Sequence, residues 1–173
     1  MKKIILLIIS VLLVAAPLSA KPQLVKRYEP GARGTVLLFV ASMCPCTDAH
    51  REMVKRLMAD TESRGVDFYC VFSNAGETRD LAEHFFRQLG WDMPYLLDGR
   101  GKLAQQFGAT NTPQAIVLDG MQQMVYRGPI DDSNRNFGRI TKPYLQNALA
   151  DVIDGRPVQI AEVPPTGCWI VSR

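Results

Sequence analysis

The chain has 173 residues, with 20 Lys or Arg and 17 Asp or Glu, and its formal net charge is +3. This length suits one domain with a sizeable core, and the near balance of charge argues against binding to nucleic acid or to an anionic membrane. No internal repeat or low-complexity run interrupts the sequence, so the composition is that of an ordinary globular domain.

The first 20 residues have the pattern of a secretory signal peptide. Two lysines give a basic start, residues 4–16 are apolar, and small residues precede Ala20. The apolar centre is shorter than the roughly 20 residues of a membrane-spanning helix, and no cysteine follows it to carry a lipid anchor. We predict a signal peptide over 1–20, cleavage after Ala20, a mature domain over 21–173, and a periplasmic or secreted protein without membrane attachment.

Two cysteines, Cys44 and Cys46, stand one proline apart where the pattern changes from strand to helix. Residues 36–40 form a short β-branched and aromatic run that is typical of a buried strand. Apolar residues then recur at helical spacing, and Thr47 and Asp48 are the candidate N-cap residues. The cysteines are therefore expected at the start of a helix.

The start of a helix favours a thiolate over a thiol, because unpaired backbone N–H groups and the positive end of the helix dipole lie there. We therefore predict that Cys44 is the reactive sulfur and that Cys46 resolves its mixed disulfide. A disulfide between them would close a very small ring stiffened by Pro45. Strained disulfides are easier to reduce, so the pair is expected to exchange rather than to staple the fold.

The other predicted elements alternate between strands and helices, after a leading irregular segment over 21–34. They are a strand over 66–72, a helix ending at Gly90, a short strand over 94–98, a helix over 102–107, a hairpin of strands 115–119 and 123–127, and a helix from Thr141 to Gly155. This order predicts an α/β fold, with a central mixed β-sheet, helices on both faces and an extended C-terminal tail. We expect the tail to dock through Trp169.

Several single residues are expected to have structural roles. Cys70 alternates with apolar residues along its strand, so we predict a small buried hydrophobe. Trp91 and Tyr126 are expected to pack in the core. Asp131 and Asp132 follow a proline and an isoleucine and are expected to cap a turn rather than to titrate in catalysis.

The sequence resembles the thioredoxin-like superfamily over essentially the whole mature chain. The resemblance depends on the strand that leads into a cysteine pair, on Thr112-Pro113 before a core strand, and on the closing hairpin and helix. It implies a thioredoxin-like fold in which the Thr112-Pro113 bond is cis and lies beside the reactive cysteine. It also implies that Thr112 and Pro113 bind an extended substrate chain.

A closer resemblance is to exported redoxin-domain proteins related to alkyl hydroperoxide reductase. It depends on the Cys-Pro-Cys turn, on the stretch from Tyr126 to Asp132, and on Gly167-Cys168 near the C-terminus. Two features depart from related families. Thioredoxins have two residues between their cysteines, where this chain has Pro45 alone, and peroxiredoxins have a threonine where this chain has Ala41.

The residues leave three functions open. The first is thiol-disulfide exchange with protein thiols or disulfides and with an upstream reductant or oxidant, needing no cofactor. In it Cys168 is a second candidate to resolve the disulfide, because the pairing of four cysteines cannot be read from sequence.

The second function is copper binding by Cys44, Cys46 and His50, since thiolates and imidazole suit copper and Cys46 and His50 share a helix face. This would resemble thioredoxin-fold copper chaperones, although those use a distal histidine and no histidine follows His84 here. The simpler expectation for His50 is an exposed helix residue.

The third function is peroxide reduction by Cys44, with Arg127 or another arginine stabilising the thiolate. The simpler expectation is that Arg127 is a surface residue.

Overall fold

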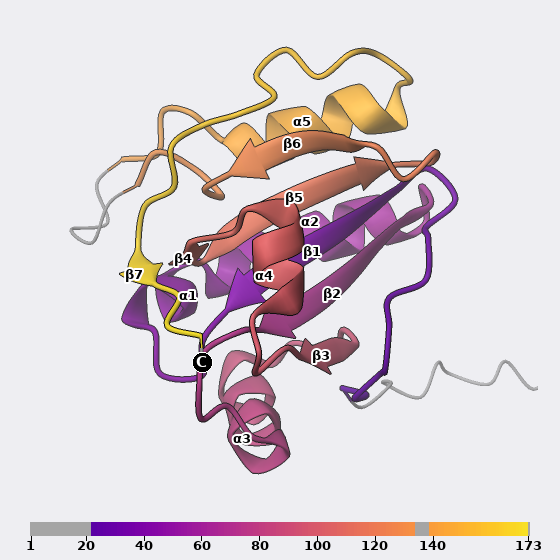
Figure 1. The fold of residues 1–173 in the computed structure, drawn as a ribbon. Coiled ribbons are helices and arrows are strands. Elements are labelled where there is room, and N and C mark those ends of the chain that lie inside the picture. Colours follow the sequence, from indigo (N-terminus) through magenta and orange to yellow (C-terminus); the bar gives the residue numbers. More distant parts are fainter. Residues whose placement is uncertain (1–21, 134–138, 173) are drawn as a thin grey trace, which may run out of the picture.

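The structure is a computed structural model that describes residues 22–133 and 139–172 (Figure 1). The predicted signal peptide over 1–20 lies outside the described residues. Within the part of the chain that is described, none of the helices is both long enough and apolar enough to cross a membrane.

A five-stranded mixed sheet forms the centre of the fold, in the order β3-β2-β1-β5-β6. Its strands are β1 (Gly34–Val40), β2 (Val66–Phe72), β3 (Tyr95–Leu97), β5 (Gln114–Asp119) and β6 (Met124–Gly128). The central strand β1 pairs in parallel with β2 and antiparallel with β5, and β5 forms a hairpin with β6. The predicted mixed sheet and its closing hairpin are confirmed.

Helices cover both faces of this sheet, as predicted. They are α1 (Pro45–Ala49), α2 (Arg51–Glu62), α3 (Arg79–Leu89), α4 (Lys102–Phe107) and α5 (Tyr144–Ile153). Apolar residues of α2, α3 and α5 share one core cluster with alternate residues of β1, and α4 joins the cluster on the opposite face. Figure 1 shows α4 in front of the sheet and α2 behind it. The last helix begins at Tyr144 rather than at Thr141, because Pro143 takes the N-cap position.

Every residue of β1 is buried, which explains why its sequence is continuously apolar rather than alternating. Around the neighbouring Phe72, the rings of Phe85, Phe86 and Tyr95 pack edge-on or tilted. Fully burying one such side chain contributes about 1.5–3 kcal/mol. The sheet is therefore a rigid base from which the end of β1 projects its loop.

The packing predictions for Cys70, Trp91 and Tyr126 are confirmed, since all three side chains are buried. Tyr126 also donates a hydrogen bond from its hydroxyl to the Pro129 carbonyl.

The C-terminal tail ends in a second, smaller sheet. Strand β7 (Cys168–Trp169) pairs antiparallel with β4 (Asn111–Thr112). Figure 1 shows the tail in yellow, running from α5 down one side of the molecule to β7, next to β4 and α1. The prediction that the tail docks is correct, but the prediction that Trp169 anchors it is wrong, because Trp169 is 73% exposed. Successive strand residues point in opposite directions, so when Cys168 faces inward Trp169 faces solvent.

Candidate functional site

Cys44 is the N-cap residue of α1 and follows β1 after a three-residue loop. Its N–H donates to the Ala41 carbonyl at 3.1 Å, and its carbonyl accepts from the Thr47 N–H at 3.0 Å. Pro45 takes the first helical position, where a missing N–H costs nothing. The expectation that Thr47 or Asp48 caps the helix is wrong, because the helix begins earlier than the apolar spacing suggests.

Three of the four cysteines meet at this point. The sulfur atoms of Cys44, Cys46 and Cys168 all lie within 4.8 Å of one another. Cys44 Sγ is 3.2 Å from Cys168 Sγ, because β7 brings Cys168 opposite Thr112 in the strand register. The fourth cysteine, Cys70, lies in β2 with no exposed surface, and its thiol donates to Met93 Sδ.

The Thr112-Pro113 peptide bond is cis and lies beside Cys44, as the resemblance implied. The Thr112 carbonyl oxygen is 3.3 Å from Cys44 Sγ. Gln114 fixes this loop, because its buried side-chain oxygen accepts from the N–H groups of Thr110 and Asn111. The loop therefore presents its backbone to the sulfur at a defined position.

The environment of Cys44 favours its thiolate. Burial raises the pKa of Cys44, but hydrogen bonds with the Thr112 and Thr47 side chains, the Cys168 thiol and the Thr47 backbone together bring the pKa below its ordinary value. The hydroxyls of Thr112 and Thr47 are buried, and neither has a well-formed hydrogen bond to another group among the described residues. A thiolate at Cys44 would use both donors.

Cys168 has the opposite tendency. Burial and its contacts with Cys44 and Cys46 raise the pKa of Cys168 to about 11. Cys44 is therefore the sulfur that becomes the anion, and Cys168 keeps its proton and can donate a hydrogen bond to Cys44.

The tail also determines which sulfur is accessible. Cys44 and Cys46 are only 6% and 7% exposed, whereas Cys168 is partly exposed on the tail strand. Met43 and Trp169, the chain neighbours of Cys44 and Cys168, are among the most exposed large apolar residues that the structure describes. The site thus consists of two buried thiols, Cys44 and Cys46, and one more exposed thiol, Cys168. Two exposed apolar side chains, Met43 and Trp169, are their chain neighbours.

A histidine and an aspartate that the sequence did not connect lie behind α1. His50 separates α1 from α2, and its Nδ1 is 2.7 Å from the Cys46 carbonyl oxygen. Its Nε2 lies 3.2 Å from both Asp131 Oδ1 and Ser133 Oγ. The expectation of an exposed His50 is wrong, because the side chain is only 11% exposed. Asp131 caps a turn as predicted, by accepting from the Ser133 N–H, and it also pairs with His50.

This pair shifts the ionisation of both partners. Burial lowers the pKa of His50, but its hydrogen bonds to Asp131 and Cys46 and the nearby charges of Asp131 and Cys44 outweigh it, so the pKa is raised. Burial raises the pKa of Asp131, but the hydrogen bonds from His50 and Ser133 bring it below its ordinary value. A charged His50 places a positive group behind the Cys46 turn.

The two other residues proposed for alternative chemistry are engaged elsewhere. Arg127 pairs with Glu162 at 2.5 Å and donates to the Phe107 carbonyl, as expected of a residue outside the site. Both nitrogens of His50 face the groups named above, so the structure groups Cys46 with Cys44 and Cys168 rather than with an imidazole ligand.

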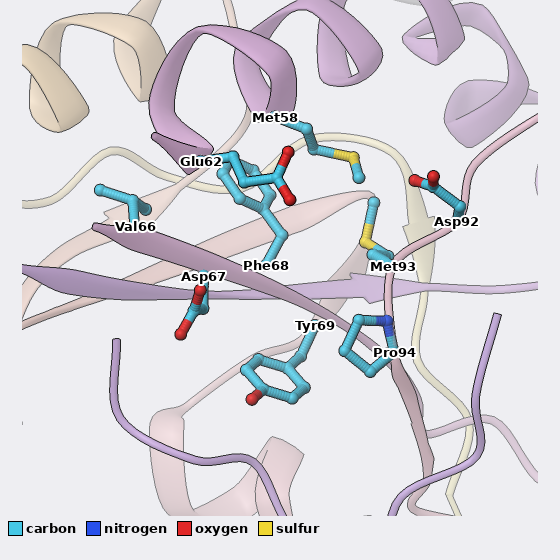
Figure 2. Close-up of a pocket in the computed structure, with 9 residues that line it drawn as sticks. All are labelled: Met58, Glu62, Val66, Asp67, Phe68, Tyr69, Asp92, Met93 and Pro94. Carbon is cyan, nitrogen blue, oxygen red and sulfur yellow. The ribbon is translucent and has the colours of Figure 1, made fainter. Parts of the chain in front are cut away.

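A separate pocket lies at the other end of the strands (Figure 2). Its lining includes Met58 and Met93 together with the carboxylates of Glu62, Asp67 and Asp92. The start of β2 forms one wall, and this is the end that pairs with Gly34 rather than with Val40. None of the three clustered cysteines lines it, so the sulfur site and this pocket are distinct.

Solved structures with related sequences have the same architecture. An uncharacterised conserved protein from Geobacillus kaustophilus is 30% identical, with a TM-score of 0.76, covering 83% of this chain and 79% of that chain. A hypothetical protein from Sinorhizobium meliloti 1021 is 26% identical, also with a TM-score of 0.76, covering 83% of this chain and 81% of that chain.

More distant structures show the same fold in proteins whose function is stated. A secreted Mycobacterium tuberculosis disulfide oxidoreductase homologous to E. coli DsbE is 14% identical, with a TM-score of 0.51, covering 72% of this chain and 83% of that chain. The fold is therefore thioredoxin-like, as the sequence predicted, whereas a specific relation to the peroxiredoxins stays a prediction. No curated protein matches the sequence significantly. Residues 15–170 match the family described as "Domain of unknown function (DUF6436)", and the chain belongs to that family.

Proposed function

We propose that this protein is an exported thiol-disulfide oxidoreductase that uses Cys44 as its reactive sulfur. The observation that carries the proposal is the gathering of three sulfurs within 4.8 Å beside the cis Thr112-Pro113 bond, with the pKa of one of them, Cys44, lowered by its hydrogen bonds. Thiolates attack disulfides and thiols do not, so a stabilised anion next to two further thiols suits exchange. The structural neighbour from Mycobacterium tuberculosis that is a secreted disulfide oxidoreductase supports the same chemistry.

The reaction transfers two electrons between the protein and a partner. A partner disulfide, R–S–S–R′, is cleaved to two thiols, while Cys44 becomes bonded to a second cysteine of the site. The second cysteine supplies one of the two protons that the partner sulfurs gain, and water supplies the other, because Cys44 reacts as a thiolate. In the reverse direction a partner dithiol is oxidised and the internal disulfide is reduced. In the oxidising compartment that export supplies, both the reduction of partner disulfides and the oxidation of partner dithiols can serve folding proteins.

The decisive experiment compares Cys44→Ser with Cys70→Ala in the mature chain over 21–173. The reduced proteins are mixed with a fluorescent disulfide peptide, and peptide reduction is followed over time. The parent protein and Cys70→Ala should reduce the peptide at similar rates, and Cys44→Ser should show only the uncatalysed rate. Equal rates for Cys44→Ser and the parent protein would contradict the proposal.

A second candidate function is the binding of a soft metal ion such as Cu(I). It is favoured by the same three sulfurs, since thiolates select Cu(I) and each cysteine offers one ligand atom. This set replaces the one predicted from sequence, with Cys168 in the place of His50. Anaerobic titration of the reduced protein with Cu(I) should then saturate at one ion per chain, and Cys168→Ser should weaken binding, while His50→Gln should not.

The two functions make opposite demands on the site, because a metal ion needs all three thiols reduced and exchange oxidises two of them. A protein that turns over the disulfide peptide and binds Cu(I) no more tightly than Cys44→Ser is an oxidoreductase alone. Hydrogen peroxide added in parallel tests the third prediction, and rapid peroxide consumption that depends on Cys44 would support it.

A further inference from the structure

We propose that Cys168 is the sulfur that partner proteins meet, and that the C-terminal strand β7 carries it as a movable arm over the buried Cys44. The inference rests on the proposed exchange function and specifies its order. It assigns the mixed disulfide with the partner to Cys168 and the internal disulfide to Cys44 and Cys168. Cys44 stays the reactive sulfur, because it leaves Cys168 when the internal disulfide opens and attacks Cys168 when that disulfide forms.

Access is the first argument. Cys44 is 6% exposed and Cys46 is 7% exposed, whereas Cys168 is partly exposed, so a partner sulfur meets Cys168 more readily than either of the other two. The Cys168 Sγ is 3.2 Å from Cys44 Sγ and within 4.8 Å of Cys46 Sγ. Attack on a disulfide requires the incoming sulfur to reach one of the two bonded atoms, and the outer atom is the reachable one.

The backbone pairing of β7 is the second argument. Cys168 stands opposite Thr112, the residue before the cis proline, and the strand pairs with β4 as an antiparallel chain. The Ile170 N–H donates to the Thr110 carbonyl, and the Asn111 side chain donates to the Gly167 carbonyl. An external chain cannot use the same β4 groups until β7 leaves, so the tail already holds the position next to Cys44.

The arm, residues 167–172, is anchored at both ends. Before it, the Arg127 N–H donates to the Ala161 carbonyl and the Val163 N–H to the Arg127 carbonyl, and within it Ile170 packs against the core. Beyond β7, Val171 donates to Asn74 Oδ1 and accepts from the Ala75 N–H. The strand itself has two residues, and one of them, Trp169, is 73% exposed. Gly167 has φ of +109°, and a Cβ added there would collide with the Thr112 carbonyl oxygen. A single substitution at Gly167 should therefore displace the arm without removing a sulfur.

The chemistry of leaving groups agrees with this order. A thiolate R–S⁻ attacks Cys168 Sγ, the R–S–Sγ bond forms, and Cys44 leaves with the electron pair of the broken disulfide. The second thiolate of the same partner dithiol then attacks its own mixed-disulfide sulfur and releases Cys168, which takes up a proton. The group with the lower pKa leaves faster, and the pKa of Cys44 is lowered while that of Cys168 is raised to about 11.

The test locates the mixed disulfide in the mature chain. The protein is oxidised with glutathione disulfide, desalted, and its internal disulfide is identified by mass mapping. It is then mixed with less than one equivalent of a peptide that has one cysteine, quenched in acid, alkylated and mapped again. We expect a Cys44–Cys168 disulfide in the first step, and in the second the peptide on Cys168 in at least about tenfold excess over Cys44. Cys46→Ser, which removes the neighbouring thiol that would move the mixed disulfide, should give the same excess.

Gly167→Ala provides the second readout. With the arm displaced, glutathione disulfide should react with Cys44 directly in the first step, releasing one glutathione thiol. The peptide thiol should then displace the bound glutathione from Cys44, so the excess of peptide on Cys168 over Cys44 should fall about tenfold, toward parity. A peptide found mainly on Cys44 in the parent protein would overturn the inference alone, as would an internal Cys44–Cys46 disulfide or a product distribution that Gly167→Ala does not change. A protein that exchanges with no thiol at all would overturn the proposed function as well.

Discussion

Cys44 and Cys70 are the same residue in opposite surroundings. Both are buried, at 6% and 0% exposed, and they belong to neighbouring strands of the sheet, one just after β1 and the other within β2. Cys44 is surrounded by hydroxyls, an amide and a second thiol, and its pKa is lowered. Cys70 is packed among apolar side chains, and its burial raises its pKa well above the ordinary value.

The difference shows that burial alone does not decide the reactivity of a cysteine. Burial raises the pKa of both thiols, and only the hydrogen-bond donors around Cys44 reverse the direction. Strand β2 places Cys70 in the core, whereas the loop after β1 delivers Cys44 to the cis-proline turn and to α1. The position in the fold, rather than the residue type, therefore separates the two thiols.

The largest expected effect comes from removing each sulfur in turn. Cys44→Ser should lower the rate of disulfide exchange by at least about a thousandfold, because the loss of a nucleophile removes most of the catalysis. Cys70→Ala should change it less than about twofold, since Cys70 touches no group of the site. Initial rates with a fluorescent disulfide peptide measure both, and a matching loss in Cys70→Ala would break the comparison.

Replacing Cys70 should lower stability more than replacing Cys44, which is the reverse of their effects on activity. Cys70→Ser buries a hydroxyl where the thiol donates to the Met93 thioether, a weak acceptor, and should lower the free energy of unfolding by about 1–3 kcal/mol. Cys44→Ser keeps the Thr112 carbonyl as an acceptor and should cost less than about 1 kcal/mol. Urea unfolding of the reduced proteins gives both values, with Cys70→Ala as the control for lost volume. Equal costs at the two sites would contradict the contrast in polarity.

The His50–Asp131 pair should make stability depend on pH in the acidic to neutral range, where the thiol of Cys70 does not titrate because its pKa is raised above 9.0. The folded pKa of His50 is raised above its ordinary 6.5, so its contribution is complete below about pH 6.5 and is lost as the pH rises through the folded value. The pKa of Asp131 is lowered from 3.8, so its contribution is present above that pH and is lost as the pH falls through the folded value. The destabilisation by His50→Gln should therefore be greatest between these pH values and should shrink above them.

Urea unfolding at a series of pH values measures this difference, with Cys70→Ala as a control whose cost should stay constant over the same range. A cost of His50→Gln that grew as the pH rose would show that His50 is not held as a cation.

The smallest effect should come from a single hydroxyl. Thr47→Val removes one donor to Cys44, raises the pKa of Cys44 and should slow exchange at neutral pH by about twofold to tenfold. Thr61→Val removes a buried hydroxyl that bonds to the Leu57 carbonyl in α2, and it should leave the rate unchanged. The pH profile of the exchange rate separates the two variants. If Thr47→Val does not shift the pH profile, the Thr47 hydroxyl does not lower the pKa of Cys44.

Local patterns in the sequence predicted most of the fold. The apolar run of β1, the alternation in β2 and the hairpin of β5 and β6 each fix an element within a few residues. The cis turn at Thr112-Pro113 beside the cysteines was implied by the family resemblance rather than by a local pattern. The change from strand to helix located Cys44, although the start of α1 was misplaced. These features are encoded over short stretches, where periodicity and turn chemistry act directly.

Long-range contacts were harder to predict. His50 and Asp131 are 81 residues apart, and nothing in either local pattern links them. The apolarity of Trp169 predicted an anchor, but its exposure follows from the alternation of a two-residue strand whose register depends on β4. The tail therefore could be predicted to dock, whereas the pairing of Cys168 with Thr112 required the structure. The sequence offered one signal for the His50–Asp131 pair. His50 follows Cys46 by four residues, and Asp131 and Asp132 lie near a predicted turn.

The most direct test of this account is the pKa of each thiol in the reduced protein. Alkylation by iodoacetamide is followed over a range of pH, and mass spectrometry resolves the rate at each cysteine. The account predicts that Cys44 titrates below an ordinary thiol, that Cys168 titrates above it, and that Cys70 stays unreactive until the protein unfolds. A Cys44 that titrates at or above the ordinary value would contradict the claim that this fold stabilises its thiolate.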